Sequence, residues 1–263
     1  MKKLFCIIIF LIMTFSFFTY VPIYIPSVAE TEHVLTIEAP SEECYTVQGA
    51  TFDGKYFYTA FINKSEAKET AIIVKTDKSG VEIARSEELD IDHANSITIL
   101  ENGNLMVAHC HSIEGNYNKF SIIDKDSLEI IVTADLLNPF MAIAYCDERE
   151  QYVGGEWNGD KINFYDDDLV YSHSIEVEYI ENSIPQSYYC TREAIYSLRF
   201  IFDEGFINYL YAYSYGGDTL LEYELNIPEN TEAEAISVIG NDVYIICGSE
   251  GKCEIFKIDK LVA

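Results

Sequence analysis

The most constraining feature of this sequence is an internal repeat with a period of 45 to 48 residues. Each copy reads as a strand, a tight polar turn and a second strand, followed by a third strand. The clearest copy runs from Gln48 to Phe52, turns at Asp53–Lys55 and continues from Tyr56 to Tyr58. The copies begin 45, 47, 46 and 48 residues apart, at Gln48, His93, Phe140, Gln186 and Glu234.

A period of this length is typical of a four-stranded propeller blade. The last copy ends at Ala263 after three strands, and Val34–Glu38 supplies a spare strand before the first copy. We therefore predict an all-β, five-bladed β-propeller over residues 33–263, built of four-stranded blades. The N-terminal strand would complete the last blade and cover its edge. The alternative is a two-sheet sandwich in which the spacing is a coincidence.

The first 29 residues have the layout of a secretory signal peptide. Lys2 and Lys3 are followed by an almost wholly apolar stretch from Leu4 to Tyr24, and Ser27 and Ala29 form a small-residue cleavage site. This pattern predicts a secreted or cell-surface protein, cleaved after Ala29. The alternative is an uncleaved membrane anchor, because about 20 apolar residues can span a bilayer.

The charge of the chain excludes some partners. There are 44 acidic and 17 basic side chains, and the net charge is −27. Such a surface repels phosphate backbones, which argues against nucleic-acid binding. It equally argues against membrane contact beyond the N-terminal segment. The acids concentrate in turns, where they keep an all-strand ring soluble.

Cysteine placement leaves two interpretations open. Cys6 lies in the signal segment. Most of the other six follow apolar strand-like runs, where a free cysteine behaves as a small buried hydrophobic residue. A disulfide is plausible only for Cys247 and Cys253, across a short turn. The six are Cys44, Cys110, Cys146, Cys190, Cys247 and Cys253.

The starts of the repeats predict a polar ring at one mouth of the central channel. The innermost strand of each blade begins beside this channel, so the residues that open each copy would converge there. We interpret them as a candidate ligand site. The alternative is that they cap strand ends and order water in the channel. The ring would comprise Gln48, His93, Asn95, Phe140, Gln186, Glu232 and Glu234.

Other patterns point less clearly to chemistry. His109 and His111 share one face of a strand, and Asp166–Asp168 is an acidic turn, but neither has the full spacing of a metal site. We predict no metal and no cofactor. Glu232 and Glu234 alternate on one strand, so they could raise one another's pKa as an acid–base pair.

Two resemblances refine these expectations. Gln48-Gly49 before the Asp53-Gly54 turn, His93-Ala94-Asn95, and Glu232-Ala-Glu-Ala-Ile236 are similar to exported propeller modules of Gram-positive bacteria. This resemblance covers nearly the whole chain after the signal segment. No activity is established for these modules. We expect a non-catalytic module that binds a small molecule, a glycan or a cell-surface protein, and the alternative is a purely structural spacer.

The second resemblance is to plant- and bacterial-type glutaminyl cyclase, also a five-bladed propeller. It rests on Thr46-Val47-Gln48-Gly49 and on the acidic stretch Glu232–Asp242. It implies an acyltransferase alternative in which Glu232 or Glu234 moves a proton. The cyclase pocket resembles a funnel rich in Trp, whereas Trp157 is the single tryptophan of this chain.

Overall fold

A computed structural model describes residues 27–64, 69–110, 116–201, 206–240 and 242–258. Within these residues the chain forms 20 β-strands and one short 3-10 turn, Asp147–Arg149, and it contains no α-helix. The strands fall into four-stranded groups, as in propeller-like folds. The all-β prediction is therefore confirmed, and the part of residues 1–29 before Ser27 lies outside the described residues.

Three of the groups are separate antiparallel sheets. In each, the strands pair in the order of the chain, as the repeat predicts. The first sheet contains β2 (Cys44–Phe52), β3 (Tyr56–Asn63), β4 (Thr70–Asp77) and β5 (Glu82–Arg85). The second contains β6 (Ser96–Ile99), β7 (Leu105–Ala108), β8 (Lys119–Ile123) and β9 (Ile130–Asp135). The third contains β10 (Ala142–Cys146), β11 (Gln151–Gly155), β12 (Lys161–Asp166) and β13 (Tyr171–Glu176).

The remaining eight strands form one continuous sheet in the order β14-β15-β16-β17-β1-β20-β19-β18. Its first half comprises β14 (Ser183–Cys190), β15 (Ile195–Ile201), β16 (Ile207–Tyr213) and β17 (Thr219–Asn226). Its second half comprises β18 (Glu232–Ile239), β19 (Asp242–Ser249), β20 (Lys252–Ile258) and β1 (Ser27–Glu38).

Strand β1 joins the two halves of this large sheet, which differs from the separate blades that the sequence predicts. Residues Thr31–Glu38 pair antiparallel with β20, close to the position predicted for the spare strand. Residues Ser27–Glu30 continue beyond it and pair parallel with β17. The strand starts seven residues before Val34, and this extra length reaches the neighbouring group.

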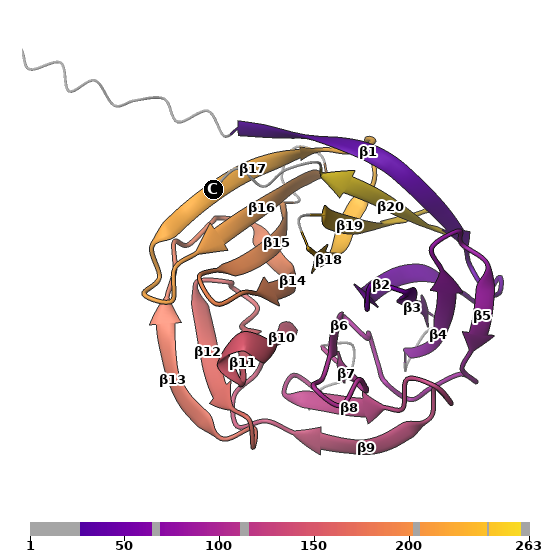
Figure 1. Ribbon diagram of the computed structural model, residues 1–263, viewed down its shortest axis with the longest axis horizontal. Coiled ribbons are helices and arrows are strands. Elements are labelled where there is room, and N and C mark those ends of the chain that lie inside the picture. Colours follow the sequence, from indigo (N-terminus) through magenta and orange to yellow (C-terminus); the bar gives the residue numbers. More distant parts are fainter. Residues whose placement is uncertain (1–26, 65–68, 111–115, 202–205, 241, 259–263) are drawn as a thin grey trace, which may run out of the picture.

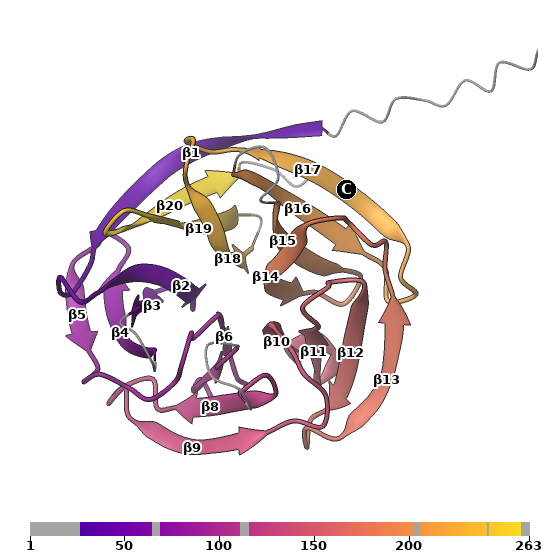
Figure 2. The same ribbon diagram turned by 180° about the vertical axis from the view of Figure 1, so that it is seen from behind.

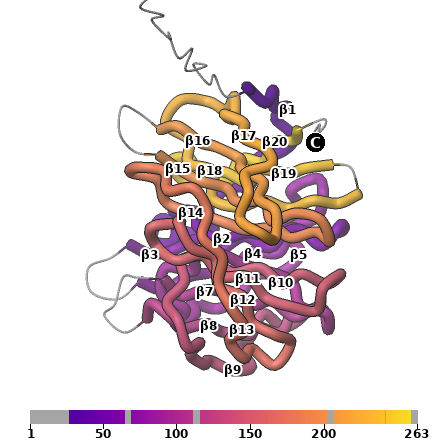
Figure 3. The backbone as a smooth tube through the Cα atoms, turned by 90° about the vertical axis from the view of Figure 1, so that its left-hand side faces the viewer, coloured from indigo at the N-terminus to yellow at the C-terminus, as the bar shows by residue number. Residues whose placement is uncertain are grey.

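The groups lie around a central axis, with β2, β6, β10, β14 and β18 innermost (Figures 1 and 2). Each of these inner strands contacts the next around the ring, including β18 with β2. In the edge-on view of Figure 3 the groups stack beside one another. The inner strands thus bring residues far apart in sequence to the same axis.

The hydrophobic core lies between neighbouring groups. One cluster joins Leu35 and Ile37 of β1 to Phe61 of β3 and Ile255 of β20, and similar clusters fill the other gaps. Middle strands are therefore buried on both faces, which explains their short continuous apolar runs rather than strict alternation.

All six cysteines of the described residues are buried, and none of them forms a disulfide with another. Cys247 pairs in register with Glu254, and Cys253 pairs with Gly248, so the two thiols are offset along the hairpin. The disulfide alternative for Cys247 and Cys253 is therefore not formed in this structure. The described residues also contain no helix long and apolar enough to cross a bilayer.

Candidate functional site

The two ends of the ring differ in their chemistry. The inner strands begin at one end, which we call the start face, and their first hairpin turns lie at the other, the turn face. Strand direction alternates within each group, so the loops between second and third strands return to the start face. The predicted polar ring belongs to the start face.

Three of the predicted residues occupy equivalent β-bulges near the beginning of an inner strand. The register of β2 with β3 shifts between Val47 and Ala50, which places Gln48 in the bulge. In the same way Gln186 is the extra residue of β14 and Glu234 that of β18. A bulge re-aims the side chain of its unpaired residue. The repeat therefore presents two amides and one carboxyl group from matched positions.

These bulged residues take part in two amide–carboxyl contacts that link neighbouring groups. Gln48 Nε2 donates a hydrogen bond of 3.4 Å to Glu234 Oε1. Gln186 Nε2 donates one of 2.5 Å to Glu232 Oε1. Both glutamines are 5% exposed and Glu234 is 1% exposed, so four of the predicted residues form one largely buried polar cluster.

His93 lies beside this cluster and has a carboxyl partner that the sequence did not indicate. Its Nδ1 contacts Glu69 Oε2, and both side chains are largely buried. Burial raises the pKa of Glu232, and Lys64 and His93 oppose this rise. Lys64, which is exposed at the end of β3, acts in the same direction on both Glu232 and Glu234. The site thus combines two acids with nearby basic groups.

Asn95 has a structural role. Its Nδ2 donates hydrogen bonds of 3.0 Å to the carbonyl of Met141 and 3.5 Å to that of Gln186. The side chain is 1% exposed. It therefore ties the starts of three inner strands together, as the strand-capping alternative predicts for this residue.

Phe140 does not join the polar cluster. It is buried in the hydrophobic core with Met106 of β7 and Tyr165 of β12. The backbone carbonyl of Met141, one residue later, accepts the hydrogen bond from Asn95. The structure thus places Phe140 in the core and outside the predicted polar ring.

Burial governs the electrostatics of the acids. Burial and the neighbouring charge of Glu232 raise the pKa of Glu234 well above its usual range. Burial also raises the pKa of Glu232, although Lys64, the hydrogen bond from Gln186 and His93 oppose this effect. Oε2 of Glu234 and Oε1 of Gln186 have no hydrogen-bond partner among the described residues. The cluster therefore retains unused buried acceptors, which favours a ligand that donates hydrogen bonds.

A pocket of about 170 Å³ opens beside the two glutamates. We call it the start-face pocket. It lies between the beginnings of β2 and β18 and the β19–β20 turn. It is lined by Tyr45, Thr46, Val47, Phe206, Asn230, Glu232, Glu234 and residues 248–251.

Exposed aromatic side chains are confined to this same face. Within the described residues, every Phe, Tyr or Trp with large exposure lies at the start of an inner strand, in a loop between second and third strands, or in a connection to the next inner strand. They are Tyr45, Tyr117, Trp157, Tyr179 and Phe206. Aromatic residues are enriched at binding surfaces because they combine apolar area with a polar or π-rich contact.

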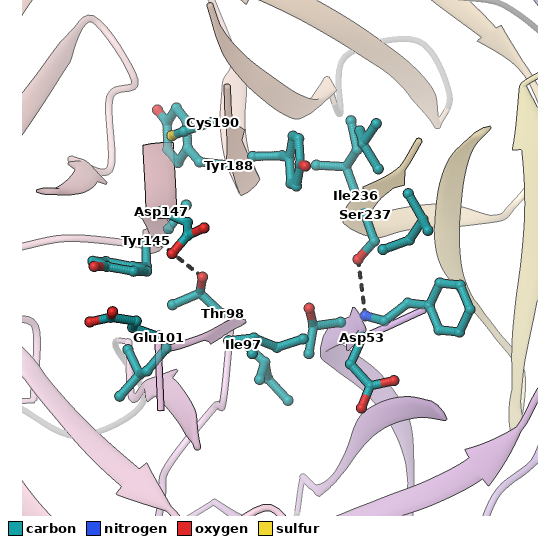
Figure 4. Close-up of a pocket in the computed structure, with 18 of the residues that line it drawn as sticks. Asp53, Ile97, Thr98, Glu101, Tyr145, Asp147, Tyr188, Cys190, Ile236 and Ser237 are labelled. Carbon is teal, nitrogen blue, oxygen red and sulfur yellow. Dashed lines mark hydrogen bonds between the residues drawn. The ribbon is translucent and has the colours of Figure 1, made fainter. Parts of the chain in front are cut away.

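A second cavity, of about 440 Å³, occupies the turn face (Figure 4). The last residues of all five inner strands line it, including Thr98, Tyr145, Tyr188 and Ser237. Thr98 accepts a hydrogen bond from the backbone N–H of Tyr145, and Ser237 accepts one from that of Phe52. Each of these hydroxyl groups therefore links its own inner strand to the neighbouring one. The sequence did not single out this cavity.

The metal alternatives gain no support from the described residues, in which no group of three His, Cys, Asp or Glu side chains is arranged to hold an ion. His109 Nε2 contacts Ser121 Oγ at 2.8 Å, and burial lowers the pKa of this imidazole to about 4. Asp166 accepts hydrogen bonds from the backbone of its own turn. His111 lies outside the described residues.

No protein-family model matches this sequence. No curated protein matches it significantly either. Among solved structures, the chain is similar to the tail fiber of Staphylococcus aureus phage P68, with a TM-score of 0.65 and 14% identity. The similarity covers 89% of this chain and 53% of the fiber, so the chain spans about half of the fiber's length.

Two further structures are more distant. A member of the DUF4221 family from Bacteroides vulgatus and YCF48 bound to D1 peptide each have a TM-score of 0.46 and 10% identity. Each similarity covers 89% of this chain and 99% of the other. The similarity to the tail fiber, at 14% identity, concerns the fold alone.

Proposed function

We propose that this protein is a secreted or cell-surface five-bladed β-propeller that binds a ligand at its start face without transforming it. Propellers are rigid frames that carry variable loops, and their function resides in sites built on the frame. The observation that carries the proposal is the buried cluster of Gln48, Gln186, Glu232 and Glu234, in which two acceptor atoms lack partners.

The proposed ring has five blades, each with one inner strand. The fifth blade is β18-β19-β20-β1, in which both ends of the chain contribute strands. The antiparallel pairing of Thr31–Glu38 with β20 supports this closure. Cleavage after Ala29 would remove most of the parallel contact with β17 and would divide the eight-stranded sheet into two blades.

A binding role accounts for features that a spacer would not need. A buried, unpartnered carboxyl oxygen costs free energy, because it loses its hydrogen bonds to water. Exposed aromatic side chains gather on one face instead of being scattered. A ligand that donates hydrogen bonds and contacts aromatic rings would use both features. The similarity to a phage tail fiber is consistent with a module that works outside a cell.

Thermal-shift measurements on the chain from Glu30 onward test this proposal. A panel of monosaccharides, amino acids and simple amines should contain at least one compound that raises the melting temperature. The shift should be reduced in Glu234→Gln and in Gln186→Leu, and retained in Glu129→Gln, an exposed carboxylate in a distant turn. The bound compound should be recovered unchanged by mass spectrometry.

Two results would contradict the proposal. One is a panel in which every shift is equal in the wild type and in Glu234→Gln. The other is conversion of the bound compound into a product, which would favour the enzymatic alternative.

A further inference from the structure

The start-face pocket has a distinctive pairing of side chains. Two exposed aromatic residues, Tyr45 and Phe206, contribute to its wall, with exposed fractions of 43% and 50%. Its inner part is formed by Glu232 and Glu234, of which Glu234 is fully buried. The pocket therefore has aromatic side chains at its exposed rim and two carboxyl groups in its inner part.

One oxygen atom in the inner part of the pocket lacks a hydrogen-bond donor. Glu234 Oε1 accepts from Gln48, whereas Glu234 Oε2 has no partner within the described residues. The backbone comes close to this carboxyl group at Gly248, where a methyl group would lie 3.4 Å from Glu234 Oε1 and 3.4 Å from Val47 Cβ. Gly248 also lines the pocket, so a side chain at this position would take up part of its space.

We propose that the start-face pocket binds the protonated amine of a small primary alkylammonium group. The nitrogen would donate hydrogen bonds to Glu234 and Glu232, and the alkyl stem would contact Tyr45 and Phe206. This inference rests on the proposed binding function and specifies the chemistry of its ligand.

Charge and hydrogen bonding together favour an ammonium. Aromatic faces attract cations, and charge-assisted hydrogen bonds to a carboxylate are stronger than neutral ones. The net charge of −27 raises the local concentration of cations. A bound ammonium would also stabilise the ionised form of Glu234, which burial and Glu232 otherwise oppose.

A primary amine fits better than two related ligands. A quaternary ammonium has no N–H group to offer Glu234 Oε2. A glycan would need more space, because the pocket of about 170 Å³ lies below the roughly 300 Å³ of typical small-molecule sites. The occupant is therefore the amine-bearing end of a ligand, such as a lysine-like side chain.

Titration calorimetry with n-butylammonium tests this inference, with n-butanol as the uncharged counterpart and butyltrimethylammonium as the counterpart without N–H donors. We expect n-butylammonium to bind at least tenfold more tightly than either. Glu234→Gln should weaken its binding at least tenfold, and Phe206→Leu or Tyr45→Leu at least threefold. Trp157→Leu, which removes an aromatic side chain outside the pocket, should leave the affinity unchanged.

Gly248→Ala provides a second test that does not remove a charge. Its added methyl group makes only ordinary contacts, so the fold should be kept while the pocket becomes smaller and the affinity falls. Circular dichroism would confirm folding of each variant. The inference is overturned if n-butylammonium shows no binding at concentrations up to ~10 mM, which would detect even a weak affinity. It is equally overturned if n-butanol binds as tightly, or if Glu234→Gln does not change the affinity.

The failure of this inference can be separated from that of the proposed function. If a monosaccharide, and not an amine, binds in a manner that depends on Glu234, the ammonium assignment is wrong and the binding function stands. If no compound depends on Glu234, both are wrong.

Discussion

Glu232 and Glu234 lie two residues apart on β18, and the charge of Glu232 opposes ionisation of Glu234. Both carboxyl groups are withdrawn from water at the start face, and each receives a hydrogen bond from a glutamine of a different inner strand. The pair thus links β18 to β2 on one side and to β14 on the other. It also makes the stability of the ring depend on protonation.

The pH dependence of stability follows from the raised pKa values of this pair. Protonation of a group whose pKa is raised in the folded state stabilises the fold at low pH, and this contribution is lost as pH rises through the folded pKa. Glu234→Gln keeps the shape without the charge. The melting temperature of Glu234→Gln should therefore approach that of the wild type near pH 4. It should exceed the wild-type value increasingly from about pH 5 to 8, because an ordinary glutamate ionises near the lower end of this range.

Calorimetric scans across this range check the prediction. Glu129→Gln, in an exposed turn, is the control that corrects for the overall negative charge. A constant difference between Glu234→Gln and the wild type at all pH values would show that Glu234 titrates normally.

The repeat made much of this arrangement predictable, because equivalent positions in successive copies meet at one axis. Gln48, Gln186 and Glu234 occupy matched bulges for this reason. Phe140 lies in the core and not in the ring, and no bulge at the start of β10 marks a position that matches the other three. The periodicity of the sequence predicts where a strand lies more reliably than it predicts which face each side chain occupies.

Contacts made by loops and between groups were not predictable. Glu69 reaches His93 from the β3–β4 connection, and no spacing rule relates the two. Arg199 reads as an interruption of an apolar strand, yet it is fully buried. Its partners are two backbone carbonyls and Ser183, which the sequence cannot place.

Arg199 and Gly159 provide a stability prediction. The Arg199 guanidinium donates a hydrogen bond of 2.8 Å to the carbonyl of Gly159, in the neighbouring group. Gly159 has a φ of +64°, and an added methyl group would lie 2.1 Å from Arg199 Nη2. Gly159→Ala should displace this buried cation and destabilise the protein by about 1–3 kcal/mol.

Chemical denaturation measures this loss. Gly216→Ala is the matched control, because its methyl group would come no closer than 3.5 Å to a neighbour and its φ is not positive. Equal stabilities of the two variants would mean that Arg199 can move without cost.

The cyclase resemblance leads to an enzymatic prediction. We expect no release of ammonia above the uncatalysed rate from a peptide with an N-terminal glutamine, in a coupled spectrophotometric assay. The physical reason is that the pocket beside Glu234, of about 170 Å³, is too small to hold the end of a glutaminyl peptide. Ammonia release that is lost in Glu234→Gln would reverse this conclusion and assign the proton transfer to that carboxyl group.

The N-terminal strand yields the last prediction. Thr31–Glu38 pairs with β20, whereas Ser27–Ala29 pairs with β17. A chain that begins at Glu30 should therefore keep the closed ring and unfold in one transition. A chain that begins at Ala39 exposes the backbone of β20 and should be less stable and prone to aggregate, because an unpaired edge strand can pair with another molecule.

Mass spectrometry of the protein isolated from its own cells and from their medium gives the natural starting residue, and light scattering of the two truncated chains gives their association state. If the chain from Ala39 remains monomeric and as stable as the chain from Glu30, strand β1 does not close the ring. If the isolated protein retains residues 1–29, the uncleaved-anchor alternative is favoured, and the parallel pairing with β17 persists in the natural protein.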